Sequence, residues 1–108
     1  MTVSELCAVL GAKQICLPKG ERVIDGAYIG DLLSWVMGRA PADSAWITIM
    51  SNVNVVAVAS LADVACVIFA EGVEPDPQAK QRAENEGINL ISSNEAAYEI
   101  ACKLSELL

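Results

Sequence analysis

The spacing of apolar positions changes from segment to segment along the chain, and each spacing predicts a helix or a strand. The first ten residues have a helical period that begins with a capping-box pattern at Thr2 and Glu5 and ends before a glycine. Short extended segments follow at Lys13–Leu17 and Arg22–Tyr28, and a second helical period covers Asp31–Gly38.

The second half of the chain alternates regularly between apolar strands and helices. Continuous apolar runs of β-prone residues are typical of strands covered on both faces. A proline directly after Asp76 is typical of the first position of a helix. The predicted order is strand Trp46–Met50, helix Val53–Leu61, strand Ala65–Ala70, a helix from Asp76 to Gly87, strand Asn89–Ser92 and a final helix capped by Asn94.

The segment Val53–Leu61 has two interpretations. Its valines favour a strand locally, whereas Ser51 and Asn52 form a good helix cap and the alanines suit a packed helix. A strand here would leave no room for a crossover connection after the preceding strand, so we predict a helix. A membrane span over Val53–Ala70 is disfavoured, because Asp63 inside it would cost about 2.5–3.5 kcal/mol on insertion.

This alternation predicts an α/β fold for one domain that spans residues 1–108. Repeated strand–helix–strand units imply parallel strands joined by right-handed crossovers, with helices on the sheet faces. We therefore expect a small layered domain with a mostly parallel central sheet flanked by helices. A chain of 108 residues is long enough for a single core.

The composition adds an expectation about assembly and disfavours two kinds of partner. Hydrophobic residues make up 54% of this short chain, so we expect a second copy to cover part of the apolar surface, most simply in a two-fold homodimer. The net charge is −7, and the seven basic residues are scattered. We expect neither nucleic acid nor an anionic membrane as a partner, because both require clustered positive charge.

Four cysteines lie in apolar stretches, and no two have the C-x-x-C spacing typical of a zinc site. We expect all of them to be free thiols in the core, and they are Cys7, Cys16, Cys66 and Cys102. The sequence shows no signal-peptide pattern, so we expect a reducing, cytoplasmic location.

Enzyme chemistry has little support in the sequence. The chain has no histidine, which excludes Ser-His-Asp and Cys-His nucleophilic sites. It also lacks the glycine-rich motifs that bind dinucleotides or nucleoside triphosphates. We therefore expect a protein that is not an enzyme and uses no cofactor or metal. Trp35 and Trp46 are expected in the core, with an exposed partner anchor at Trp35 as the alternative.

Polar residues follow three of the predicted parallel strands, at the carboxyl ends where ligands gather in open α/β sheets. Asn52 and Asn94 stand at predicted helix starts, where free N–H groups favour an anion; the alternative is a capping role alone. Positive charge would come only from Arg22 or Arg39 folding over the site. The candidate ligand-binding residues at these junctions are Ser51, Asn52, Asn54, Glu71, Gly72, Ser92, Ser93 and Asn94.

The chain resembles the DRTGG domain family over nearly its whole length. The name-giving motif is nearest at Glu21-Arg22 and Asp25–Ala27, which keep the arginine and one glycine but lack the threonine and the second glycine. The segments that carry the resemblance are Gly26–Leu33, Trp46–Ser60 and Val67–Gly72.

The resemblance implies a regulatory domain with a small layered α/β fold. Such domains are similar to the N-terminal domain of HPr kinase/phosphorylase, and they occur in long phosphotransacetylases and between CBS domains of pyrophosphatases that respond to adenine nucleotides. It adds Gly26, Gly30 and Asp31 to the candidate ligand-binding residues. We expect a module that senses an adenine nucleotide or another phosphoanion and acts in trans on a partner enzyme or kinase. The alternative is a pure interaction and dimerisation subunit with no small ligand.

Overall fold

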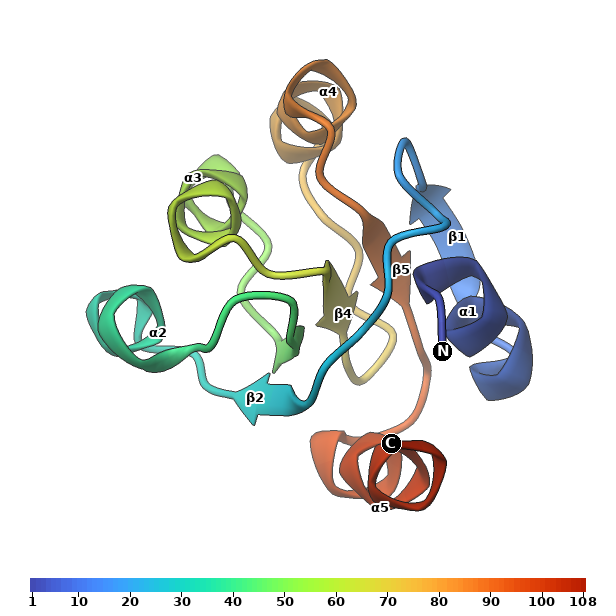
Figure 1. The fold of residues 1–108 in the computed structure, drawn as a ribbon. Helices are drawn as coiled ribbons and strands as arrows, with labels where there is room; N and C mark the ends of the chain where they lie inside the picture. Colours follow the sequence, from blue (N-terminus) through green and yellow to red (C-terminus); the bar gives the residue numbers. More distant parts are fainter.

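The computed structural model describes all 108 residues and contains one five-stranded sheet between two layers of helices (Figure 1). Short connections join most neighbouring elements, as is usual in a small domain. The elements in chain order are α1 (Val3–Leu10), β1 (Lys13–Cys16), β2 (Ala27–Ile29), α2 (Leu33–Arg39), β3 (Ala45–Thr48), α3 (Val53–Ala62), β4 (Cys66–Phe69), α4 (Pro77–Glu86), β5 (Leu90–Ser92) and α5 (Ala97–Leu107).

The sheet has the strand order β1-β5-β4-β3-β2. Strands β2, β3, β4 and β5 are parallel, and β1 pairs with β5 in the antiparallel direction. The crossover helices α2, α3 and α4 all lie on one face, while α1 and α5 lie on the other (Figure 1). This architecture confirms the predicted α/β fold with a mostly parallel sheet, and the antiparallel β1 is its one exception.

Each face of the sheet has its own apolar core. In β4 the side chains alternate between the faces, so Cys66 and Ile68 pack toward α1 and α5 while Val67 and Phe69 pack toward the crossover helices. All four are fully buried, which explains the continuous apolar run in the sequence. Trp46 is also fully buried, and its indole N–H donates to the carbonyl of Gly30 at 2.9 Å.

Several predicted boundaries move by a few residues. The segment from Val53 is a helix, as predicted, and it is capped by Asn52. Asn94 does not cap α5, because that helix begins only at Ala97, where the Glu99 carboxylate accepts from the N–H of Ala96. The extended segment expected at Arg22–Tyr28 is strand only from Ala27, where β2 begins, and it has one further bridge, between Val23 and Thr2.

Two side chains expected in the core are at the surface. Cys102 is exposed on α5, whereas the other three cysteines are buried. Trp35 on α2 is 52% exposed, and the Arg39 guanidinium lies 3.6 Å from its ring centroid. The predictions of a buried Cys102 and a core Trp35 are therefore wrong, because a helix beside an edge strand buries only a narrow stripe of its surface. No helix combines the length and apolarity needed to cross a membrane.

Candidate functional site

The loops that follow the four parallel strands meet along one edge of the sheet, which we call the carboxyl edge. The loops after β4 and β5 are joined directly there, since the N–H of Glu71 donates to the carbonyl of Glu95 and the N–H of Gly72 to that of Ser93, both at 2.8 Å. The predicted site residues that the fold brings to this edge are Gly30, Asp31, Ser51, Asn52, Asn54, Glu71, Gly72, Ser92, Ser93 and Asn94.

Gly26 lies at the other end of β2, because it precedes that strand instead of following it. Its backbone has a positive φ of +87°, and its carbonyl accepts from the N–H of Ala45 at 3.0 Å. Gly26 lines a groove between β2 and α5. The structure therefore does not bring it together with the other predicted site residues.

Asp31 connects the loop after β2 to the end of β3. Its Oδ1 accepts from the Thr48 hydroxyl at 2.8 Å and from the N–H of Ile49 at 3.0 Å. Thr48 is 2% exposed, and its Oγ1 accepts in turn from the N–H of Met50 at 3.2 Å. Sequence reasoning missed Thr48, because a threonine inside an apolar strand resembles any other β-prone residue. These bonds hold Asp31 against β3, which is why α2 begins two residues later than predicted.

A tight turn follows β4 at this edge. Glu71 and Gly72 both have positive φ, +60° and +73°, and the N–H of Val73 donates to the carbonyl of Ala70 at 3.1 Å. A Cβ on Gly72 would lie 3.1 Å from the Asn94 Oδ1, so the turn and the loop after β5 are closely packed. The left-handed conformation is costly for a glutamate, and the hydrogen bond of its N–H across to the next loop holds it there.

The polar side chains at the carboxyl edge fall into two groups. The side chains of Asn52, Ser92 and Ser93 form hydrogen bonds within and between these loops and so shape them. Asn52 Oδ1 accepts from the N–H of Asn54 at 2.9 Å. The Ser92 hydroxyl donates to the carbonyl of Val73 at 2.6 Å, and Ser93 Oγ accepts from the N–H of Glu95 at 3.1 Å. The side chains of Ser51, Asn54 and Asn94 make no hydrogen bond within the chain. This second group offers hydroxyl and amide groups to a ligand.

Two lysines supply positive charge to the same edge. Lys13 is there because β1 runs antiparallel and begins beside Ser92, and its Nζ lies 2.8 Å from Glu74 Oε1. Lys103 reaches back along α5 to form an ion pair with Glu95. Sequence reasoning missed both lysines, because the direction of β1 has no signal in the sequence and Lys103 is eight residues from Glu95, outside the i,i+4 spacing that marks ion pairs on a helix. The Lys13 and Glu74 side chains are 63% and 53% exposed, so this pair is open to exchange with a ligand.

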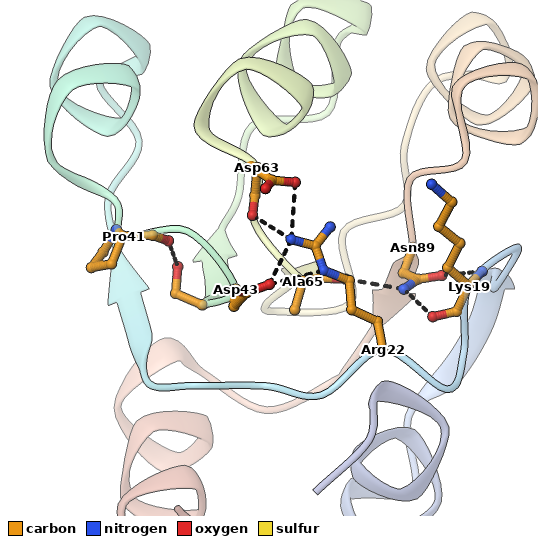
Figure 2. A network of polar contacts seen from close by, with 8 residues as sticks. Lys19, Arg22, Pro41, Asp43, Asp63, Ala65 and Asn89 are labelled. Atoms are coloured by element: carbon orange, nitrogen blue, oxygen red, sulfur yellow. Dashed lines mark hydrogen bonds and ion pairs between the residues drawn. The ribbon is translucent and has the colours of Figure 1, made fainter.

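Arg22 does not fold over the carboxyl edge, because it is bound at the opposite edge (Figure 2). Its guanidinium donates to Asp43 Oδ1 at 2.8 Å, and to the carbonyl and Oδ1 of Asp63 at 2.7 and 2.9 Å. Burial opposes the positive charge, but the hydrogen bonds and charges of the two aspartates prevail and raise the pKa of Arg22. Arg22 therefore joins the segment before β2 to the loops before β3 and β4.

Asn89 strengthens the same opposite edge. Its amide N–H groups donate to the carbonyls of Lys19 and Ala65 at 2.8 and 3.0 Å, and its Oδ1 accepts from the N–H of Lys19 at 2.9 Å (Figure 2). Arg39 is also unable to serve the carboxyl edge, since it ends α2 and stacks on Trp35. Positive charge at the candidate site therefore comes from the two lysines and from neither arginine.

A comparison with solved structures finds a similar fold in another protein. A solved structure of the CBS and DRTGG domains of the regulatory region of Clostridium perfringens pyrophosphatase, in complex with the activator diadenosine tetraphosphate, matches 94% of the chain with a TM-score of 0.71. The identity is 12%, so this likeness concerns the fold, and the chain spans 44% of that structure's length.

No curated protein matches the sequence. The family model described as DRTGG domain, in contrast, matches residues 5–107, which is nearly the whole chain. The layered fold and the regulatory region that shares it agree with this match. The chain belongs to the DRTGG domain family.

Proposed function

We propose that this chain is a non-catalytic, cytoplasmic regulatory module that binds a nucleotide or another small phosphoanion at the carboxyl edge. The observation that carries the proposal is that polar side chains without an internal hydrogen bond and two lysines lie at the carboxyl edge, the place where open α/β sheets bind ligands. The residues assigned to the ligand are Ser51, Asn54 and Asn94, together with Lys13 and Lys103.

Binding proceeds by exchange of ion partners. In the free protein the two lysines are paired with Glu74 and Glu95. An exposed ion pair contributes no more than about 1 kcal/mol, so a phosphate group replaces a glutamate at little cost. The released glutamates and the loop after β4 then move, and this movement is the signal that a homodimer passes in trans to a partner enzyme or kinase.

The Clostridium perfringens structure supports a nucleotide as the ligand, because that regulatory region is complexed with diadenosine tetraphosphate. Adenine nucleotides and dinucleoside polyphosphates are therefore the first probes. We would measure the melting temperature with AMP, ADP, ATP, diadenosine tetraphosphate and inorganic phosphate. A ligand at about 100 times its Kd adds roughly 2.7 kcal/mol of stability, which is on the order of 10 °C for a domain of this size.

The variants Lys13→Gln and Asn54→Ala are expected to lower the ligand-induced shift in melting temperature. Lys19→Gln is the matched control, because Lys19 is an exposed lysine at the opposite edge and is held there through its backbone. A screen without any shift, or equal shifts in all three variants, would refute a phosphoanion site at the carboxyl edge.

Trp35 favours a second candidate function, a pure interaction subunit. An exposed tryptophan with an arginine stacked on it is the kind of pair that anchors protein interfaces. Under this function the ligand screen is flat. Proteins that co-purify with the unmodified chain are then lost when Trp35→Ala is used, whereas Leu61→Ala, at another exposed apolar position, retains them.

A further inference from the structure

We propose that the free edge of β2 pairs with the β2 strand of a second copy across a two-fold axis, so that one continuous sheet runs through both subunits. This assigns an interface to the homodimer of the proposed function, and it does not depend on the ligand. Strand β2 is the last strand of the sheet order and lies at its rim, with β3 on one side and no strand on the other (Figure 1).

The backbone of β2 is prepared for such pairing. The carbonyl of Gly26 accepts from the N–H of Ala45, and the N–H of Gly30 donates to the carbonyl of Ile47, so these alternate positions face β3. In a parallel pair every second residue directs its N–H and C=O groups to the neighbouring strand, and the residues in between direct theirs away from it. The N–H and C=O groups of Ala27 and Ile29 therefore point outward along an open edge.

One register satisfies all of these outward groups. If Ala27 lies opposite the partner subunit's Ile29, the two strands exchange both pairs of N–H···O bonds and the two-fold axis passes beside Tyr28. The paired segment is short, because the chain turns at Gly26 and leaves the sheet after Gly30. In this register Asp25 lies opposite the partner subunit's Asp31 beyond each end of the pair, and these like charges limit the pairing to residues 26–30.

The surface beside β2 has a shape that fits a second copy of itself. A groove of about 320 Å³ lies between β2 and α5, and none of its lining side chains is charged: Gly26, Ala27, Ile29, Ala101, Leu104, Ser105 and Leu108. Residues directly opposite in an antiparallel pair share a face. The partner's Ile29 therefore lies beside the small Ala27 and enters this groove, and Ile29 does the same on the other subunit.

Exposed apolar side chains lie next to the β2 edge. Ile29 and Leu108 line the groove and are 50% and 47% exposed, and Tyr98, three residues before Ala101 on α5, is 77% exposed. Residues three apart are neighbours on a helix surface, so these side chains form an apolar surface that a second copy would cover.

The absence of charge from the edge supports pairing with an identical chain. Natural edge strands are usually protected by a lysine, a proline or an inward-pointing charge. Residues 26–30 contain none of these, although the chain carries a net charge of −7. The paired residues themselves therefore bring no charged side chains together, and the nearest charges along the strand are Asp25 and Asp31 at its two ends.

Sedimentation equilibrium of the full chain at micromolar concentration tests the interface. The unmodified protein is expected to have the mass of a dimer, and Ile29→Lys that of a monomer, because Ile29 is 50% exposed in the free subunit and the lysine places charge in the groove. Ala27→Pro removes only an outward N–H and is also expected to give a monomer. Val9→Lys, at a 55% exposed apolar position on α1, is the control and remains a dimer.

A disulfide tests the register independently. Tyr28 faces its own symmetry mate as a non-hydrogen-bonded pair, with Cα atoms about 4.5 Å apart, which a disulfide can span. In a Cys102→Ser background, Tyr28→Cys is expected to form a covalent dimer on oxidation, and Val9→Cys is not. A monomeric unmodified protein, or a dimer that survives both edge variants, would overturn the proposal. Either outcome is separable from a flat nucleotide screen, because none of these measurements contains a ligand.

Discussion

At the scale of single residues, the four thiols occupy two different environments. Cys66 is fully buried between the sheet and α1, and burial, with a smaller contribution from Cys7, raises its pKa to about 12. Burial also raises the pKa of Cys7 and of Cys16. Cys102 is exposed on α5. Because the thiolate is the reactive species, only Cys102 is placed to react.

This difference predicts a simple titration. With Ellman's reagent near neutral pH, one thiol per folded chain is expected to react quickly and all four are expected to react in urea. Cys102→Ser should remove the rapid reaction. Since the folded pKa of Cys66 lies above its ordinary value of 9, its contribution to stability is present below pH 9 and is lost as the pH rises above it. Rapid reaction of two or more thiols in the folded protein would contradict the assignment.

Asp31 was predicted to bind a ligand, and in the structure its carboxylate has a structural role. Its carboxylate accepts two hydrogen bonds from the end of β3, and so it acts as a bridge between neighbouring loops. Asn52 does the same within its own loop by capping α3. The side chains left for a ligand are those that make no internal bond, and this criterion is available only from the structure.

At the scale of elements, two glycines illustrate opposite demands on the backbone. Gly72 has a φ of +73°, and an added Cβ would lie 3.1 Å from Asn94 Oδ1. Gly38 lies within α2, and an added Cβ there would meet nothing within 4 Å. A side chain is therefore strained in the turn after β4 and favourable in the helix.

Substitution by alanine is expected to change stability in opposite directions at these two positions. Gly72→Ala should lower the free energy of unfolding by about 1–2 kcal/mol through left-handed strain, and Gly38→Ala should raise it by roughly 0.5–1 kcal/mol. Urea denaturation measures both. Equal effects of the two substitutions would show that the turn after β4 is not held in the conformation described.

At the scale of the whole molecule, the long segment between β1 and β2 crosses the edge of the sheet opposite the candidate site (Figure 2). Arg22 joins this segment to Asp43 and Asp63, which lie ahead of β3 and β4. Asp43 and Asp63 both have left-handed backbone conformations, with φ values of +63° and +58°. One guanidinium thus connects three parts of the chain that are distant in sequence.

Arg22→Ala is expected to lower the free energy of unfolding by about 2 kcal/mol, the range measured for hydrogen bonds to charged groups. Arg22→Lys should recover only part of this loss, because an ammonium cannot donate as a planar fork. Arg82→Ala is the control, since Arg82 forms an exposed pair with Glu86 on a single helix turn and should cost far less. Equal losses at both arginines, measured in urea, would contradict the bridging role of Arg22.

Local pattern was sufficient for the element types. Capping at Thr2, the helix from Val53, and proline at the first position of α4 are all present, because each depends on neighbours a few residues away. The alternation of strands and helices was sufficient for the parallel sheet, since short crossovers allow few other arrangements. The resemblance to the DRTGG family, carried by these same segments, is confirmed.

The sequence by itself therefore determined the type and order of the elements, the parallel strands and the edge where the polar loops meet. Only the tertiary structure decided that β1 is antiparallel, which brings Lys13 to that edge, and that Arg22 is bound at the other. It also decided that Trp35 and Cys102 are exposed. The physical reason is range: helix and strand periods arise from bonds between near neighbours, whereas strand direction, burial and charge partners depend on residues far apart in the chain.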